Sequence, residues 1–354
     1  MGTRRVGKTV LAQAIRKSFT GKTLFLNAED FDVQELLKNR SVSNYERIIG
    51  NARLFILDEA QVLPEVGSIL KLIIDSFPAL TILATGSSSF DLANKTGDPL
   101  TGRMIRYQLY PLSQQEIGSQ ENAIETFQHL EDRLIFGSYP EVIQLFTYKE
   151  KADYLLQLVQ SYLLKDILAY DGIRQADKIH KLLKLIAFQS GSEVSYHELA
   201  QQLSMSKNTV EHYLDLLSKV FILYKVSAYS TNPRKEISKS SKWYFYDTGI
   251  RNAIINDFRL PALRNDLGLL WENYLMAERI KKNAYEGKNV QSYFWRNYNQ
   301  QEIDLLEWDN GQMAAFEFKY AVTKKVKLPT GFATSYPDVP FQVISREHYL
   351  DWIT

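Results

Sequence analysis

Residues 2–9 read Gly2-Thr3-Arg4-Arg5-Val6-Gly7-Lys8-Thr9, which has the spacing G-x-x-x-x-G-K-[ST] of a phosphate-binding loop, or P-loop. In such a loop the glycines let backbone N–H groups curve around phosphate oxygens at the start of a helix. Lys8 can reach the β- and γ-phosphates of a nucleotide, and the Thr9 hydroxyl can bind Mg²⁺. The plainer alternative is a basic turn that contains glycine. We therefore predict that these eight residues bind ATP together with Mg²⁺.

A second motif lies about fifty residues further along, where the run Leu54-Phe55-Ile56-Leu57 is followed by Asp58 and Glu59. A buried strand of this kind delivers Asp58 to the carboxyl edge of a parallel sheet, where it can hold Mg²⁺ through water. Glu59 is then placed to orient or deprotonate an attacking water. The alternative is a strand that ends in a solvated turn.

A third apolar run, Thr81–Ala84, ends in Thr85-Gly86-Ser87-Ser88-Ser89. A polar side chain at this position would lie between the two earlier motifs and could sense the γ-phosphate. We favour Ser87 for this role over Ser88. An ordinary turn between a strand and a helix is the alternative.

The pattern of apolar residues predicts an α/β chain with a parallel sheet near the N-terminus. Together with the phosphate-loop motif, this sheet indicates a P-loop NTPase fold. The expected strands are residues 23–26, 54–57, 81–84 and 105–109. Residues 112–175 have a helical period, and residues 176–261 contain short helices followed by strand-like runs. Residues 262–354 open with a long amphipathic helix and continue as strands. We predict four domains with these boundaries: 1–111, 112–175, 176–261 and 262–354.

These motifs resemble a prokaryotic family of AAA-type ATPases that carry a C-terminal domain of unknown function. The N-terminal stretches that carry the resemblance are GTRRVGKT (2–9), LFILDEAQ (54–61), TGSSSF (85–90) and LTGRMIRYQLYPLSQQEI (100–117). The C-terminal ones are SYLLKDIL (161–168), KWYFYDTGI (242–250), RNDLGLLWENYLMAERI (264–280), EIDLLEW (302–308) and AFEFK (315–319). The resemblance implies an ATPase core, a helical lid, a winged helix and a restriction-nuclease-like domain. It also implies that Arg103 meets a γ-phosphate, in cis or across a subunit interface, although a surface ion pair is the plainer role.

A P-loop directly follows the carboxyl end of a strand, and in the family that strand lies in the centre of the sheet. Here Gly2 is the second residue, so no sequence is left for the strand. We expect a gap between residues 81–84 and 105–109, or direct pairing of these two runs, and a disordered or displaced P-loop. A misplaced start codon, a trimmed gene or a degenerate copy would each produce this sequence.

A helix-turn-helix is predicted after Ser195, which with Glu198 forms a capping box. Residues 221–228 and 242–246 could pair as a wing whose loop holds Arg234, Lys235, Lys239 and Lys242. The second helix offers Lys207, Asn208 and Thr209 to nucleic acid, but also Glu211 and Asp215, which phosphates would repel. The segment can therefore be interpreted either as a small helical module that only packs against the rest of the chain or as a DNA-binding module.

The C-terminal residues contain the order of a PD-(D/E)xK nuclease: Glu272 on a helix, Asp304 on a strand, then Glu317 and Lys319 on one face of the next strand. Asp304 and Glu317 would bind Mg²⁺, Glu272 could add a ligand, and Lys319 would steady the nucleophile. The alternatives are a nuclease-like fold that does not cleave and an unrelated fold.

Composition narrows the classes of function. The 42 Lys and Arg residues balance 41 Asp and Glu residues, so a wholly basic nucleic-acid coat is excluded. The chain has no Cys, which excludes a thiolate zinc site and suits a reducing compartment. We predict a cytoplasmic, membrane-free ATPase that acts on or is regulated by DNA or RNA, with a homo-oligomer as one option. The alternatives are a nucleotide-dependent switch with an inactive docking domain, and a Mg²⁺ nuclease with a vestigial ATPase.

Overall fold

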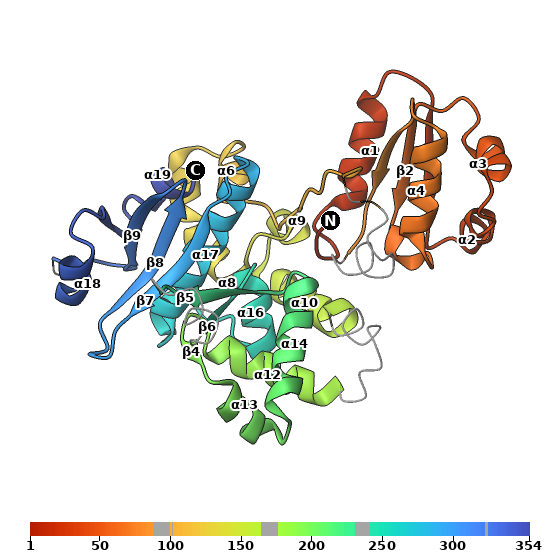
Figure 1. Ribbon diagram of the computed structural model, residues 1–354. Coiled ribbons are helices and arrows are strands. Elements are labelled where there is room, and N and C mark those ends of the chain that lie inside the picture. Colours follow the sequence, from red (N-terminus) through yellow and green to blue (C-terminus); the bar gives the residue numbers. More distant parts are fainter. Residues whose placement is uncertain (88–99, 101, 164–175, 231–240, 323–324) are drawn as a thin grey trace. The chain divides into compact units, whose positions relative to one another are not determined.

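The computed structural model describes residues 1–87, 100, 102–163, 176–230, 241–322 and 325–354, with the side chains of 162, 163 and 176 left out (Figure 1). These residues form two compact units. The first contains Met1–Tyr110 with Lys219–Phe221, and the second contains Pro111–Ser218 with Ile222–Thr354. Each unit has its own sheet.

The sheet of the first unit has three parallel strands in the order β1 (Thr23–Asn27), β2 (Leu54–Asp58) and β3 (Thr81–Ala84). These are the first three predicted strands, so that part of the prediction is confirmed. The central strand β2 is buried along its whole length. A strand covered on both faces reads as a continuous apolar run, which is why LFIL could be recognised in the sequence.

Helices cover both faces of this sheet (Figure 1). On one face, Ala12 of α1 (Lys8–Ser18) packs against Leu54 and Ile56. On the other, Phe55 and Leu57 pack in a core with α4 (Val66–Ser76) and its neighbours α2 (Phe31–Lys38) and α3 (Val42–Ile49). The turn η1 (Ala60–Val62) follows β2 directly. Alternate residues of β2 thus contact opposite helical layers, as the two-residue period of a strand requires.

The fourth predicted strand, residues 105–109, is wrong: no strand is assigned there. The Met1 ammonium donates to Tyr107 O at 2.7 Å, Leu109 N–H donates to Met1 O at 2.6 Å, and Gly2 N–H donates to Gly86 O at 3.3 Å. Two residues therefore lie where a central strand was expected, and they give residues 105–109 too few partners for a ladder. A Cβ at Gly2 would lie 2.1 Å from Leu109 O, so this close approach requires glycine. As expected, no strand of the described residues enters the P-loop. The expected gap or direct pairing is not found, because Met1 and Gly2 lie between Gly86 and residues 107–109.

The second unit begins as a series of helices, in agreement with the helical period of residues 112–163. They are α6 (Gln114–Gly118), α7 (Ala123–Gln128), α8 (Leu130–Phe136), α9 (Pro140–Gln144), α10 (Tyr148–Leu158) and the π-helical turn η2 (Val159–Leu163). The helices α6, α7 and α10 each start with a reciprocal capping box, whose N-cap residues are Ser113, Asn122 and Thr147. Leu155 and Leu158 are buried as expected. Residues 164–168 of the SYLLKDIL stretch lie outside the described residues.

Seven strands form the sheet of the second unit, in the order β10-β9-β8-β7-β5-β6-β4. They are β4 (Glu193–Val194), β5 (Leu223–Ala228), β6 (Ser241–Phe245), β7 (Gln291–Arg296), β8 (Glu302–Asp309), β9 (Gln312–Phe318) and β10 (Phe341–Ile344). β5 pairs with β7 in parallel, and this pairing joins strands from both sides of the predicted boundary at residue 261. The segments 176–261 and 262–354 therefore share one sheet.

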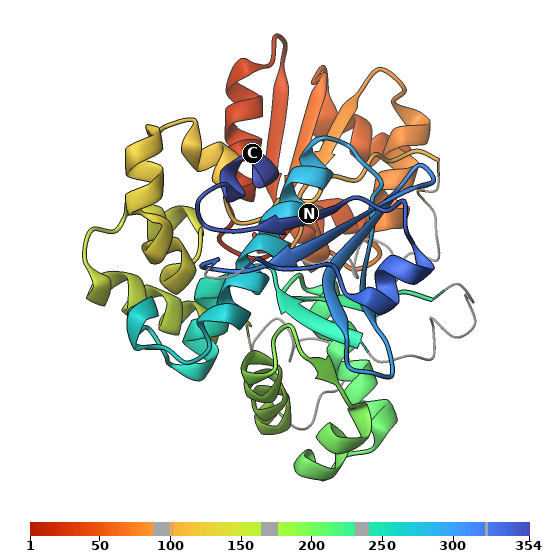
Figure 2. The ribbon, with the colours of Figure 1, turned by 90° about the vertical axis from the view of Figure 1, so that its left-hand side faces the viewer.

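Helices pack around this sheet. The long helix α17 (Leu267–Tyr285) lies across it (Figures 1 and 2), with Leu270, Trp271 and Leu275 in one core with Phe294 and Leu305. The remaining elements of this unit are α12 (Ala176–Phe188), α13 (Tyr196–Leu203), α14 (Lys207–Lys219), α16 (Thr248–Ile255), η3 (Pro261–Leu263), α18 (Thr330–Ser335) and α19 (Tyr349–Ile353).

The helix-turn-helix pattern appears as α13 and α14. Ser195 caps α13 by accepting a hydrogen bond from Glu198 N–H at 3.3 Å, and Val210, Leu214 and Leu217 bury one face of α14. β5 and β6 pair antiparallel, as expected. The expectation that Lys242 lies in an exposed loop is wrong, since Lys242 is the second residue of β6 and is buried. Arg234, Lys235 and Lys239 lie outside the described residues.

Asp266, immediately before α17, receives charged hydrogen bonds from two buried arginines. Arg251 donates to it at 2.5 Å and Arg264 at 2.8 and 2.9 Å. Although burial alone would raise the pKa of Asp266, the hydrogen bonds from Arg264 and the charge of Arg251 lower it to about 2. The folded state therefore favours the carboxylate.

Asp266→Asn should lower the free energy of unfolding at neutral pH by up to about 3 kcal/mol, because two buried guanidinium groups lose their counter-ion. A lowered folded-state pKa contributes stability that is complete above the ordinary pKa near 4 and is lost as the pH falls toward 2. The difference between wild type and variant, measured by urea unfolding, should thus be constant above about pH 4 and shrink below it. The exposed Asp153→Asn is the control. A difference that grows on acidification would contradict this assignment.

Candidate nucleotide site and carboxylate cluster

The P-loop lies at the N-terminus of α1 and holds a defined conformation. Gly7, at the N-cap, has φ +95°, a left-handed value that favours glycine, and Arg5 has φ +67°. The Lys8 ammonium donates to Gly2 O at 3.1 Å and to Thr3 O at 2.9 Å, so the loop closes around its own lysine. The expectation of a disordered or displaced loop is wrong, because contacts from α1 to β2 keep it beside the sheet.

The flanking loop side chains have separate roles. Val6 is buried, and Arg4 forms an ion pair with Glu29 at 3.9 Å. Neither side chain is needed to bind phosphate, since a P-loop uses its backbone N–H groups for that purpose.

Thr9 and Asp58 meet at the position where the sequence predicts a magnesium site. The Thr9 hydroxyl donates to Asp58 Oδ2 at 2.7 Å, and the Thr85 hydroxyl donates to Asp58 Oδ1 at 2.5 Å. Asp58 is 2% exposed. A hydroxyl and a carboxylate are hard oxygen ligands, and Mg²⁺ binds proteins through one or two such groups while keeping its waters. The residues present therefore fit Mg²⁺.

Glu59 follows β2 with a left-handed backbone, φ +51° and ψ +40°. Its N–H donates to the Thr85 hydroxyl at 3.1 Å, and its Oε1 lies 4.0 Å from the Lys8 ammonium. A non-glycine residue in this region is strained, and such strain gathers at functional sites. The turn thus places the Glu59 carboxylate beside the P-loop lysine.

Ser87 lies in the same network, connected to Glu59 through Gln61. Gln61 Nε2 donates to Glu59 Oε2 at 2.5 Å and to Ser87 Oγ at 3.1 Å, while Ser87 N–H donates to Gln61 Oε1 at 3.3 Å. Both Gln61 and Ser87 are buried.

The alternative residue Ser88 lies outside the described residues. Sequence reasoning missed Gln61 and Thr85, although each is a neighbour of a predicted site residue.

Gln61→Ala should lower kcat for ATP about tenfold and leave nucleotide affinity within about threefold, because Gln61 orients Glu59 and contacts neither Lys8 nor Thr9. Steady-state turnover together with fluorescent-nucleotide titration separates the two effects. The neighbouring exposed Val62→Ala serves as the control. A loss of affinity equal to the loss of turnover would refute a role in positioning alone.

Arg103 forms an ion pair with Asp75 of α4 at 3.0 Å, and both side chains are more than two-fifths exposed. This is the plainer of its two predicted roles. An exposed pair of this kind contributes little to stability.

In the second unit, Glu272 lies on α17, Asp304 on β8 and Glu317 on β9, and Lys319 is the first residue after β9. β8 and β9 are antiparallel neighbours, as expected. Asp304 Oδ2 accepts from Phe318 N–H at 2.8 Å, and Lys319 donates to Glu317 Oε1 at 2.7 Å. We call these four residues, with Lys242 and Glu302, the carboxylate cluster.

Lys242 and Glu302 belong to this cluster although the sequence did not single them out as part of it. The Lys242 ammonium lies 2.5 Å from Glu302 Oε1 and 3.3 Å from Glu272 Oε1, and the lysine side chain is 2% exposed. Tyr244, two residues along β6, donates to the same Glu272 oxygen at 2.6 Å. β6 thus brings a cation and a hydroxyl to the helix carboxylate.

Glu272, Asp304 and Glu317 have raised pKa values, as expected, but burial is the main cause. Burial raises the pKa of Glu272 to about 7; the charge of Lys242 opposes this rise, and that of Asp304 adds to it. Burial likewise raises the pKa of Asp304, and it raises that of Glu317 with help from the negative charge of Asp304. Asp304 and Glu317 are therefore close enough to interact electrostatically.

Within the residues that the structure describes, no three His, Cys, Asp or Glu side chains are arranged so that they could hold a metal ion. The predicted metal set of Glu272, Asp304 and Glu317 is thus not assembled as a metal site, and Lys242 lies among these acids instead. The described helices include none long and apolar enough to cross a membrane.

Comparison with protein families divides the chain into three matched regions. Residues 1–118 match the model described as "AAA domain", and residues 127–260 and 267–349 match two different domains of unknown function, DUF8612 and DUF4143. With the geometry of Lys8, Thr9 and Asp58, the first match decides the class of the first unit. It is an AAA-type ATP-binding domain of the P-loop fold.

Relatives extend over most of the chain. An uncharacterized protein of Mycobacterium tuberculosis is 27% identical, with 92% of this chain and 70% of the relative covered. An uncharacterized protein of Haemophilus influenzae is 26% identical, with 72% of this chain and 68% of the relative covered. Among solved structures, the replication initiator DnaA bound to AMPPCP and single-stranded DNA covers 61% of this chain and 80% of its own, at 21% identity and a TM-score of 0.30. At that TM-score nothing is concluded from the likeness.

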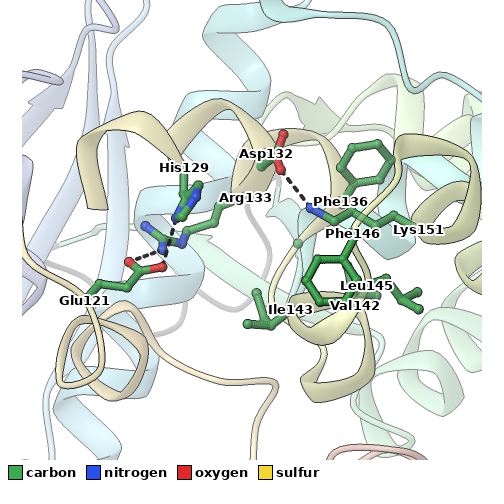
Figure 3. A pocket seen from close by; sticks show the side chains of 11 residues that line it. Glu121, His129, Asp132, Arg133, Phe136, Val142, Ile143, Leu145, Phe146 and Lys151 are labelled. Carbon is green, nitrogen blue, oxygen red and sulfur yellow. Dashed lines mark hydrogen bonds and ion pairs between the residues drawn. The ribbon is translucent and has the colours of Figure 1, made fainter. Parts of the chain in front are cut away.

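Beyond the AAA-type domain, the second unit has a pocket of about 320 Å³ lined by α8, α9 and their neighbours (Figure 3). Arg133 and His129 pair with Glu121, and Lys151 donates to Asp132 at 2.7 Å. Figure 3 shows the remaining lining as apolar side chains. These are Phe136, Val142, Ile143, Leu145 and Phe146. Because the acids of this pocket are paired with its basic side chains, its charges do not indicate a particular class of ligand.

Proposed function

We propose that this protein hydrolyses ATP in its AAA-type domain and uses the cycle to change the state of its second unit. The observation that carries the proposal is the contact of Thr9 with Asp58, at 2.7 Å, with Glu59 4.0 Å from Lys8. These four side chains converge on one edge of the sheet, where α1 begins. Phosphate grip, metal binding and water activation need these four groups in this arrangement.

Each residue has a defined part in the proposed reaction. Lys8 exchanges the carbonyls of Gly2 and Thr3 for phosphate oxygens, and the backbone from Gly2 to Gly7 surrounds the phosphates. Thr9 and Asp58 would hold Mg²⁺, which would neutralise charge on the phosphates. Glu59 takes a proton from the attacking water, and Ser87 reports on the γ-phosphate through Gln61. Arg103 would add positive charge only after leaving Asp75, in cis or in a homo-oligomer.

The second unit supports a link to nucleic acid through its helix-turn-helix. Lys207 and Asn208 are exposed at the start of α14, as a helix that reads DNA requires. Glu211 and Asp215, one and two turns later, are exposed as well and would weaken contact with phosphates. We propose that α13, α14, β5 and β6 form a winged helix that contacts DNA or RNA only near Lys207.

Measurements of ATP turnover distinguish an ATPase that nucleic acid stimulates from a nucleotide-dependent switch. ATP hydrolysis by the full chain should rise several-fold when double-stranded DNA or structured RNA is added at low salt. The same addition to Lys207→Glu should have a much smaller effect. Slow turnover that nucleic acid leaves unchanged, combined with ATP-dependent oligomerisation, would favour the nucleotide-dependent switch instead.

We also propose that α17 and β7–β10 form a nuclease-like fold that docks rather than cleaves. The order of Glu272, Asp304, Glu317 and Lys319 supports the fold, and the burial of Lys242 among the acids supports the loss of cleavage. Incubation of the chain with Mg²⁺ or Mn²⁺ and assorted DNA and RNA should give no cleavage. Asp304-dependent cleavage that survives Lys8→Ala would favour the nuclease with a vestigial ATPase.

A further inference from the structure

Lys242 is enclosed on several sides by groups that attract a cation. Two carboxylates, from Glu302 and Glu272, contact its ammonium at 2.5 and 3.3 Å. The ring of Phe294 lies beneath it, with 5.3 Å between the ammonium and the ring centroid. The charge of Asp304 also acts on Lys242. These groups reach the ammonium from α17, β7 and β8, so a cation at this point satisfies three neighbouring elements at once.

A divalent metal does not fit beside this ammonium. A Mg²⁺ or Mn²⁺ ion would need oxygens of Glu272 at about 2 Å, yet one of these oxygens already accepts from both Lys242 and Tyr244. The ammonium and the metal would also repel one another strongly in a buried environment. The lysine side chain is 2% exposed, so the ammonium is shielded from solvent where it contacts the carboxylates.

We propose that Lys242 is the resident cation of the carboxylate cluster and takes the place of a divalent metal. The carboxylates that a nuclease would use for Mg²⁺ are held by a covalently attached ammonium, so the wild-type cluster binds no divalent ion. The cluster then serves to join β6 and β8 to α17. This inference concerns the second unit alone and does not depend on ATP hydrolysis.

The first test is a titration of the full chain with Mn²⁺ in the absence of nucleotide. Electron paramagnetic resonance measures the Mn²⁺ that is bound. Wild type and Asp304→Asn should bind the same number of Mn²⁺ ions with the same affinity. Any weak binding at Thr9 and Asp58 is common to both proteins and cancels in the comparison. Loss of one Mn²⁺ site in Asp304→Asn would overturn the proposal.

The second test removes the cation. Lys242→Ala should gain one Mn²⁺ site per chain, and Mn²⁺ should raise its melting temperature by several degrees while leaving that of wild type unchanged. The double variant Lys242→Ala/Asp304→Asn should lose both effects. Lys225→Ala is the matched control, because Lys225 is an exposed lysine on the adjacent strand β5. A folded Lys242→Ala without a new site would overturn the proposal, and if this variant does not fold, the first test decides alone.

Discussion

Glu59→Gln should stop ATP turnover while leaving nucleotide binding intact. The carboxylate lies 4.0 Å from Lys8 and is held by Gln61, so it is placed to accept the proton of the attacking water. Glutamine has the same shape but cannot accept a proton, and loss of a general base costs about 10²–10⁴-fold in rate. Phosphate release under saturating MgATP measures the loss, and a fluorescent ATP analogue measures affinity. Affinity should stay within about threefold, because Glu59 is not among the groups that grip phosphate.

Glu65→Gln is the matched control for this experiment. Glu65 also has a left-handed backbone, φ +53°, but it is exposed and pairs with Arg40. Its replacement should leave turnover unchanged. Equal hydrolysis by wild type and Glu59→Gln would remove Glu59 from the reaction, and with it the assignment of the site.

Lys8→Ala should abolish tight binding of MgATP. Without nucleotide the buried ammonium donates to Gly2 O and Thr3 O, and phosphate oxygens are stronger acceptors than these neutral carbonyls. Removing a buried charge that bonds to an oppositely charged group costs about 2–5 kcal/mol, or about 30-fold to several thousand-fold in affinity. Calorimetric titration with a non-hydrolysable ATP analogue and Mg²⁺ measures this loss.

Lys17→Ala, an exposed residue on the same helix α1, controls for the loss of one positive charge. Its affinity should match that of wild type at moderate salt. The far-ultraviolet circular dichroism of Lys8→Ala should also match wild type, since β1–β3 do not depend on this lysine. An affinity that survives Lys8→Ala would show that phosphate is gripped elsewhere.

Much of the nucleotide site could be predicted because its signals are local in the chain. Phosphate binding needs Gly7, Lys8 and Thr9 in immediate succession at a helix start, and a central strand such as LFIL is apolar throughout because both its faces are buried. Asp58 and Glu59 follow that strand, so their place at the sheet edge followed from the strand itself. The same holds for the predicted cap at Ser195, where a side chain bonds a backbone group three residues away.

Partners that are distant in sequence could not be predicted in this way. Gln61 and Ser87 are 26 residues apart in the sequence but form a hydrogen bond, and Lys242 and Glu272 do so at a separation of 30 residues. No local pattern specifies such distances, because they depend on how strands pair and how helices lie on them. The pairing of β5 with β7 likewise joins two segments whose local patterns look like separate domains.

The sequence by itself determined the class of the first unit, the position of its P-loop motif and the order of the nuclease-like carboxylates, because each of these rests on spacing along a helix, a strand or a turn. Only the tertiary structure decided that residues 105–109 form no strand, that Met1 and Gly2 fill the central gap and that the P-loop keeps its place. The tertiary structure also decided that Lys242 is buried among the acids. A strand exists only where a neighbour supplies its ladder, and a lysine is buried only where other elements bring carboxylates to it, so both depend on contacts that the chain makes after folding.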